Sequence, residues 1–164
     1  KKVKLFTGPP SHKEDDAKVV HELMTNADIR IVSGGTTSQI VARELGVEVK
    51  SSTEIYDKEV PPIAYIQGVD LVTEGVLTLS KTIDRLKSLS KSLDSDIFKA
   101  KDGASQMAKL LYSASHIKLL VGRSLNIANA ESSFQRDLEL RLHVVGELEK
   151  ILVKLGKIVT VEYY

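Results

Sequence analysis

One sequence unit recurs along the chain. It consists of a short run of β-branched and aliphatic residues, a cluster of small polar residues, and a segment whose apolar residues have helical period. Its three clearest copies begin with the runs at 29–32, 69–72 and 117–121. A strand that is followed by a helix joins its next neighbour through a crossover that covers one face of the sheet. The repetition therefore predicts an α/β fold, in which strands and helices alternate over the whole length.

The remaining segments fit the same scheme. We expect further strands at 1–6, 47–49 and 157–164, and helices at 11–27, 36–45, 76–86, 102–111 and 138–155. Ser11 and Glu14 have the spacing of a capping box, Asp102 is an expected N-cap, and Gly46 is expected to end its helix. The prediction is one three-layer, Rossmann-like domain over residues 1–164, with a mostly parallel sheet and helices on both faces.

Composition narrows the class of protein. The 164 residues include no Cys, which excludes disulfides and thiolate metal sites, and the net charge of +1 gives no reason to expect nucleic acid. Aromatic residues make up only 5 %, which disfavours base stacking. The sequence has no apolar stretch long enough for a membrane span or a secretory signal. We therefore expect a cytoplasmic domain without membrane insertion, and its start within a strand suggests excision from a longer chain.

Small and polar residues gather where three of the predicted strands end. In an open parallel sheet, ligands bind beyond the carboxyl ends of the strands, so these clusters are the candidate ligand-binding site. They comprise Ser33, Gly34, Gly35, Thr36 and Thr37; then Thr73, Glu74 and Gly75; and then Arg123 and Asn126 in the segment 122–126. An anion at the first cluster could accept from the free N–H groups that open the next helix.

Each cluster also has a purely structural interpretation. The first can be a tight turn with a capping threonine, and Glu74 can be a favourable acidic residue in the first turn of a helix. Arg123 could clamp a phosphate or carboxylate with Asn126 as a further donor, or it could pair with a surface acid.

Several motifs of known chemistry are missing from the sequence. There is no Walker loop, no complete dinucleotide-binding glycine pattern and no nucleophile elbow of a serine hydrolase. His21 and Glu22 lack the second histidine of a zinc-protease helix. We accordingly predict no catalytic residues and no metal ligands.

Several sequence segments resemble those of a known family. The segments are 7–10 (TGPP), 34–45 (GGTTSQIVAREL), 61–63 (PPI), 68–79 (GVDLVTEGVLTL), 121–123 (VGR) and 159–164 (VTVEYY). Together they resemble the region that follows the catalytic domain in a subset of bacterial stage II sporulation protein E type serine/threonine phosphatases. The stretches 88–101 and 127–137 take no part in this resemblance.

The resemblance implies a regulatory domain with its catalytic domain absent. Phosphatases of that family hold two Mn²⁺ or Mg²⁺ ions with aspartates, and those residues do not carry over to this chain. Asp15 and Asp16 lack the flanking glycine and threonine of the metal motif, and Asp102-Gly103 opens a predicted helix. A parent chain would be a metal-dependent hydrolase, whereas this domain would contain no cofactor and would have its own phosphatase domain as partner.

Three functions remain open on these grounds. The first is a non-catalytic regulatory domain that binds a small anionic metabolite at the strand ends, with Glu74 and Arg123 facing the ligand. The second is a module that dimerises or docks a partner, in which the strand ending at Tyr163 and Tyr164 pairs edge to edge with another chain. The third is an enzyme similar to sugar-phosphate isomerases, in which Glu74 would be required for turnover.

Overall fold

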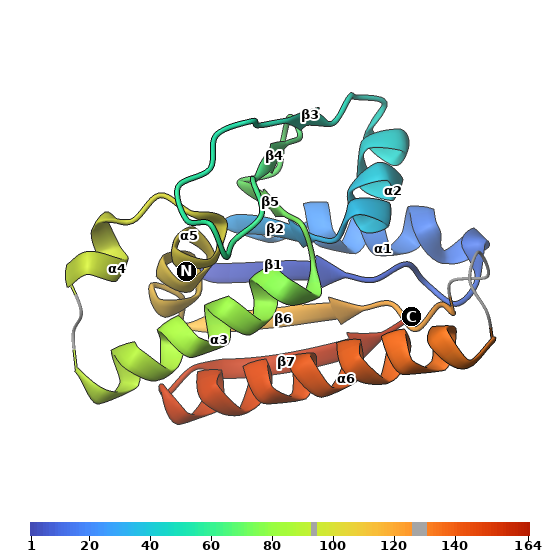
Figure 1. The fold of residues 1–164 in the computed structure, drawn as a ribbon. Helices are drawn as coiled ribbons and strands as arrows, with labels where there is room; N and C mark the ends of the chain where they lie inside the picture. The colour runs from blue at the N-terminus through green and yellow to red at the C-terminus, as the bar shows by residue number, and fades with distance from the viewer. Residues whose placement is uncertain (93–94, 126–130) are drawn as a thin grey trace.

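A computed structural model describes residues 1–92, 95–125 and 131–164 of the chain (Figure 1). Strands and helices alternate as the periodicity predicts. The strands are β1 (Lys2–Thr7), β2 (Ile29–Ser33), β3 (Lys50–Ser51), β4 (Ala64–Tyr65), β5 (Leu71–Thr73), β6 (His116–Val121) and β7 (Ile158–Tyr163). The helices are α1 (Asp16–Met24), α2 (Gly35–Leu45), α3 (Val76–Lys91), α4 (Ser95–Lys99), α5 (Gly103–Tyr112) and α6 (Glu131–Lys154), with a 3₁₀ turn η1 (Lys13–Asp15) before α1.

The strands form a seven-stranded sheet in the order β3-β4-β5-β2-β1-β6-β7. The run β5-β2-β1-β6-β7 is parallel, and the short strands β3 and β4 add an antiparallel edge beyond β5. The chain moves outward from β1 in one direction through β2 and β5, and in the other through β6 and β7. The strand order therefore reverses between β1 and β6, as it does in doubly wound folds.

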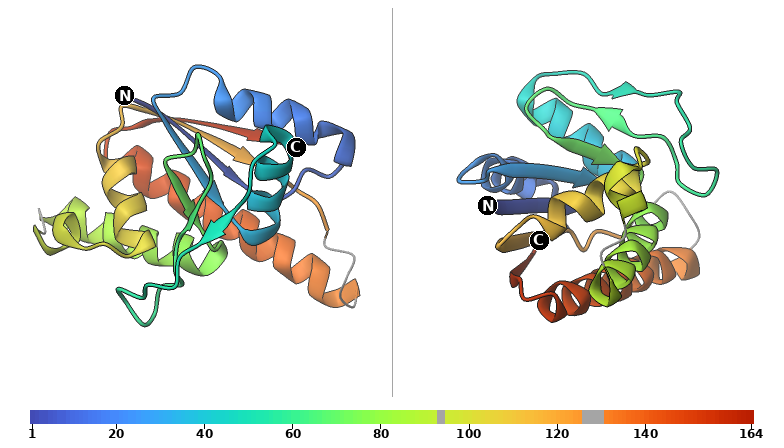
Figure 2. Two further views of the ribbon diagram at one scale, coloured as in Figure 1. Left: turned by 90° about the horizontal axis from the view of Figure 1, so that it is seen from above. Right: turned by 90° about the vertical axis from the view of Figure 1, so that its left-hand side faces the viewer.

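Helices cover both faces of this sheet, as the views in Figure 2 show. One core packs α1 and α2 against alternate strand residues such as Phe6, Val32 and Leu120. The other core packs α3, α5 and α6 against their neighbours in sequence, such as Leu5, Ile31 and Leu119. Because successive strand residues point to opposite faces, both cores need apolar residues, and β1, β2 and β6 accordingly read as nearly continuous apolar runs. The predicted three-layer, Rossmann-like α/β fold is confirmed.

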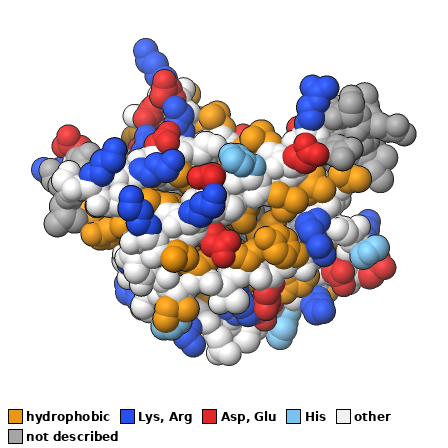
Figure 3. Space-filling model, turned by 90° about the horizontal axis from the view of Figure 1, so that it is seen from below, with side chains coloured by type: hydrophobic (Ala, Val, Ile, Leu, Met, Phe, Trp, Pro, Cys, Tyr) orange, Lys and Arg blue, Asp and Glu red, His pale blue; other side chains and the backbone are white. Residues whose placement is uncertain are grey.

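The outer surfaces of the helices are mixed in character. The underside of the molecule, seen in Figure 3, carries charged side chains of both signs among scattered apolar ones. In the part of the chain that the structure describes, no helix is both long enough and apolar enough to cross a membrane.

Several element boundaries differ from the predictions. The first helix spans only Asp16–Met24, and Ser11 does not cap it: its backbone N–H donates to the carbonyl oxygen of Tyr164 at 3.2 Å. The predicted strand at 47–49 is wrong, since the short strand lies at Lys50–Ser51 and pairs with Ala64–Tyr65, a strand that the sequence did not predict. The last helix begins seven residues earlier than 138, at Glu131.

Two predicted helix ends are confirmed. Asp102 accepts a hydrogen bond from the backbone N–H of Ser105 at 2.9 Å and so caps α5. Gly46 has φ 69° and ends α2 in the left-handed conformation, where glycine avoids the steric penalty of a Cβ atom.

Candidate functional site

The loops that follow β2 and β5 meet at the carboxyl edge of the sheet. The two strands are parallel neighbours, with Ser33 opposite Thr73. The backbone N–H of Gly34 donates to the carbonyl oxygen of Thr73 at 2.9 Å, and the Thr73 hydroxyl donates to the Ser33 hydroxyl at 3.1 Å. The first two predicted clusters, far apart in sequence, are therefore brought together.

Glycines make this close approach possible. Gly34 has φ 127° and Gly75 has φ 152°, a region that side-chain-bearing residues rarely adopt. A Cβ atom on Gly75 would lie 3.5 Å from the Cα atom of Gly34, so the two loops pack backbone against backbone. The sheet edge is thus built from glycine backbone at this point.

Two helices begin at these loops without side-chain caps. Gly34 is the N-cap of α2 and Gly75 is the N-cap of α3, and neither supplies a side-chain hydrogen bond, in contrast to Asp102 at α5. The first N–H groups of a helix have no intrahelical acceptor, and the helix dipole makes this end positive. Both helices therefore direct a partly positive end toward the carboxyl edge of the sheet.

A pocket of about 340 Å³ opens between the start of α2, the end of β5 and the segment that contains β3 and β4. The described residues in its wall are small, polar or apolar, and one of them, Glu74, has an ionisable side chain. The lining residues are Gly35, Ser38, Gln39, Val49, Ser51, Ser52, Pro61, Pro62, Ile63, Ala64, Val72, Thr73 and Glu74. We call this the β2–β5 pocket.

Ion pairs hold the segment 52–62, which leads into one wall of the β2–β5 pocket. The guanidinium of Arg85 on α3 lies 3.0 Å from the Asp57 carboxylate and 3.4 Å from that of Asp102. Lys81, one turn earlier on α3, pairs with Glu59 at 3.0 Å. The acidic residues of this segment thus anchor it to α3.

The residues of the first cluster take different positions. Gly35 lines the pocket, and both Gly35 and Thr36 are exposed. Thr37 is buried instead, and its hydroxyl accepts a hydrogen bond from the backbone N–H of Gly8 at 2.9 Å. Ser33 is also fully buried. Ser33 and Thr37 therefore join neighbouring strand ends and do not line the β2–β5 pocket.

The third cluster lies apart from the first two. It follows β6, which is separated from β2 by β1. The Arg123 guanidinium lies 5.5 Å from the centre of the Tyr163 ring, on the β7 side, and Arg123 does not line the β2–β5 pocket. Its expected position facing the same ligand as Glu74 is therefore wrong for this pocket. Asn126 lies outside the described residues.

The sequence analysis missed part of the pocket wall. Ser38 and Gln39 follow the glycine turn directly and could have been found by extending that cluster by one helical turn. Pro61, Pro62 and Ile63 take part in the resemblance, but they were not predicted as site residues. Their place in the wall depends on the pairing of β3 with β4, and no turn motif in the sequence indicates that pairing.

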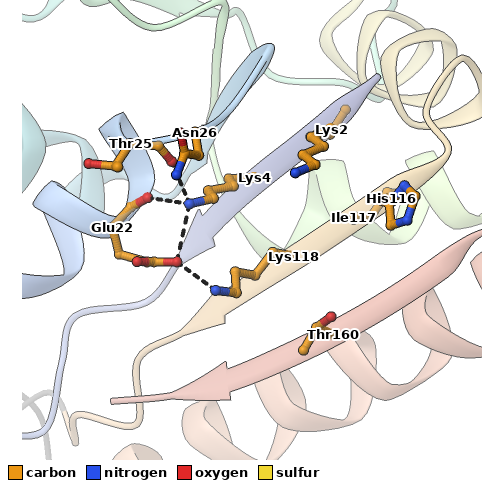
Figure 4. Close-up of a pocket in the computed structure, with 10 residues that line it drawn as sticks. Lys2, Lys4, Glu22, Thr25, Asn26, His116, Ile117, Lys118 and Thr160 are labelled. Atoms are coloured by element: carbon orange, nitrogen blue, oxygen red, sulfur yellow. Dashed lines mark hydrogen bonds and ion pairs between the residues drawn. The ribbon is translucent and has the colours of Figure 1, made fainter.

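A second pocket, of about 280 Å³, lies near the amino ends of the parallel strands (Figure 4). Lys4 of β1 and Lys118 of β6 point into it, and Glu22 of α1 lies between them at 3.1 Å and 2.6 Å (Figure 4). Lys118 also pairs with Glu162 at 3.2 Å. Because the two lysines already have acidic partners, this pocket is a structural ion-pair network joining α1 to the sheet.

The hydrogen bond to Lys118, followed by the bonds and charge of Lys4, lowers the pKa of Glu22 despite the opposing effect of burial. The hydrogen bond with Glu22 likewise raises the pKa of Lys118.

Within residues 1–92, 95–125 and 131–164, no three His, Asp or Glu residues are grouped so that they could hold a metal ion.

No family model matches the chain, and neither does any curated protein or any solved structure.

Proposed function

We propose that this protein is a non-catalytic, regulatory ligand-binding domain that holds a small anionic molecule in the β2–β5 pocket. The observation that carries the proposal is the convergence of the Gly34 and Gly75 loops, which places the open end of α2 against a pocket at the carboxyl edge of the sheet. Ligands of doubly wound folds bind at this edge.

The pocket lining restricts the chemistry of the ligand. None of the described residues that line the pocket is a lysine or arginine, so an anionic group would depend on the N–H groups and the dipole at the start of α2. That end is equivalent to roughly half an elementary charge. Ser38, Gln39 and Glu74 can instead hydrogen-bond hydroxyl groups. The lining suits a small molecule with one anionic group and several hydroxyls, such as a sugar phosphate.

The resemblance to phosphatase-associated domains supports a regulatory role. We propose that ligand occupancy adjusts a phosphatase domain of the same parent chain. In this proposal the metal ions and the phosphatase activity belong to the catalytic domain of the parent chain.

Calorimetric titration with sugar phosphates, nucleotides and dicarboxylates tests the proposal. A Gly35→Asp variant is the informative one, because a Cβ atom at Gly35 would meet nothing within 4 Å and an acid is favourable in the first turn of a helix. Its carboxylate would occupy the start of α2 and repel an anionic ligand, so we expect binding to weaken at least about tenfold.

Gly146→Asp provides the matched control, since Gly146 of α6 also has nothing within 4 Å of a Cβ atom and does not line the β2–β5 pocket. This variant should bind as the wild type does. The proposal fails if no compound of the panel gives a heat change, or if Gly35→Asp binds its ligand unchanged.

The exposed edge of β7 favours a second candidate, a dimerisation module. Within the described ranges of the chain, β7 ends the sheet and pairs with β6 alone, and Ile158 and Tyr163 on it are exposed. Its unpaired backbone groups could add a strand from a second copy. Sedimentation analysis should then show a concentration-dependent dimer, and monomers at all concentrations would refute this candidate.

A further inference from the structure

Arg141 of α6 lies where the strand order reverses. The loop after β1 contains Gly8 and the loop after β6 contains Gly122, and these loops cross between the two strand ends. The backbone N–H of Gly122 donates to the carbonyl oxygen of Thr7 at 3.0 Å, and Arg141 Nη1 donates to the carbonyl oxygen of Gly122 at 2.9 Å. The half-buried guanidinium of Arg141 is therefore held at the crossing of the two loops.

Glycine at position 8 makes room for this side chain. Gly8 has φ 86°, and a Cβ atom there would lie 2.8 Å from both Cδ and Nη1 of Arg141. Gly122 is crowded as well, since its Cβ atom would lie 2.0 Å from the carbonyl oxygen of Gly8. Any side chain at these positions would displace either the loops or the arginine.

Among the described residues, no ion pair within 4 Å is found for Arg141. A guanidinium has five N–H donors, and the structure gives Arg141 a hydrogen bond to the Gly122 carbonyl oxygen alone. Arg43 and Arg85, by comparison, lie 2.7 Å and 3.0 Å from carboxylates of Asp16 and Asp57. Burial lowers the pKa of Arg141, and the charge of Asp137, one helical turn earlier on α6, opposes this effect.

We propose that Arg141 forms a second anion-binding site, which takes a phosphate or carboxylate group at the crossing of the β1 and β6 loops. A guanidinium binds the planar or tetrahedral oxygens of such groups through paired hydrogen bonds. The reversal of strand order is also where ligands enter doubly wound sheets. This site is formed by other residues than the β2–β5 pocket, and it does not depend on the function proposed for that pocket.

Nuclear magnetic resonance titration of the full chain with inorganic phosphate, and separately with citrate, tests the site. We expect progressive shifts of the Gly8 and Gly122 amide signals and of the Arg141 Nε–H signal. Phosphate alone, citrate alone or both acting would each support an anion site and would show which oxygen group it takes. No shift of these signals with either anion would overturn the proposal.

The variant Arg141→Gln separates binding from structural support, because it removes the charge and keeps the aliphatic part of the side chain and a polar end. We expect about tenfold weaker binding or more, and retained helix content by circular dichroism. Lys154→Gln removes an exposed positive charge in the last turn of α6, far along the helix from Arg141, and as the control should bind as the wild type does. Should Arg141→Gln unfold, Arg141→Lys keeps the charge and should bind more weakly than the wild type because it lacks the paired donors.

Unchanged anion binding in a folded Arg141 variant would refute the site. Gly35→Asp distinguishes this outcome from failure of the β2–β5 pocket. It should leave the Gly122 and Arg141 Nε–H shifts intact while it weakens binding at the start of α2 about tenfold or more. Each of the two proposals can thus fail without the other.

Discussion

At the residue scale, the adjacent glycines of the first cluster have different roles. Gly34 adopts φ 127°, and a Cβ atom there would lie 2.9 Å from the Thr37 hydroxyl oxygen. Gly35 begins α2 with open space around its missing side chain. The adjacent threonines differ in the same way, since Thr36 is exposed and Thr37 is buried against the loop after β1.

The alanine variants of the two glycines should therefore behave in opposite ways. Gly34→Ala places a side chain in a strained backbone conformation and should lower the free energy of unfolding by about 1–3 kcal/mol. Gly35→Ala lies in a helix and should be neutral or stabilising, by up to about 1 kcal/mol. Urea denaturation of both variants is the measurement, and equal losses of stability would contradict the assigned conformations.

At the element scale, Glu22 joins a helix to two strands. It extends from α1 to Lys4 of β1 and to Lys118 of β6 (Figure 4). Thr160 on β7 lines the same pocket (Figure 4). In this region polar contacts, and not apolar packing, connect the helix with the sheet.

The ion pairs of Glu22 predict how the stability of the protein depends on pH. The folded pKa of Glu22 lies below its ordinary value of 4.5, so its contribution to stability is present above about pH 4.5 and is lost as the pH falls through the folded pKa. Glu22→Gln should therefore lose stability at neutral pH and show a shallower decline in acid than the wild type. Unfolding free energies measured from neutral pH downward test this.

Lys118→Met should reproduce much of that effect, because the Lys118 hydrogen bond is the largest cause of the lowered pKa. A Glu22→Gln variant whose stability falls with acid as steeply as that of the wild type would show that the network does not contribute.

At the scale of the whole molecule, the sheet is shared by two cores. Leu119 and Leu120 are neighbours on β6, yet Leu119 packs under α3, α5 and α6 whereas Leu120 packs under α1 and α2. Both side chains are fully buried. Damage to either core therefore loosens the strands that support the other.

Leu119→Ala and Leu120→Ala should each destabilise the protein by about 2–5 kcal/mol, through lost burial and the cavity that remains. Because the sheet connects both cores, each variant should still unfold in one transition when followed by circular dichroism and by fluorescence of the tyrosines. Leu140→Ala is the control: Leu140 is 51 % exposed, so the change should stay within about 0.5 kcal/mol. Separate transitions for the two signals would contradict the shared core.

The pattern of apolar residues was sufficient to predict the layered α/β fold and most of its long elements. Local chemistry was equally informative at Asp102 and Gly46, because a cap or a left-handed residue acts within a few positions of its own helix. The pairing of β3 with β4 was not predictable, since strands of two residues carry too little periodic signal.

The candidate site shows the same difference between what local sequence predicts and what long-range contacts decide. The sequence by itself determined that small and polar residues follow β2, β5 and β6, and that these strand ends share one edge of a parallel sheet. Only the tertiary structure decided that Glu74 shares a pocket with Gly35, that Arg123 turns toward Tyr163, and that Arg141 occupies the crossing beside Gly8. Backbone periodicity is a local property, whereas the direction of a long side chain depends on which distant residues surround it.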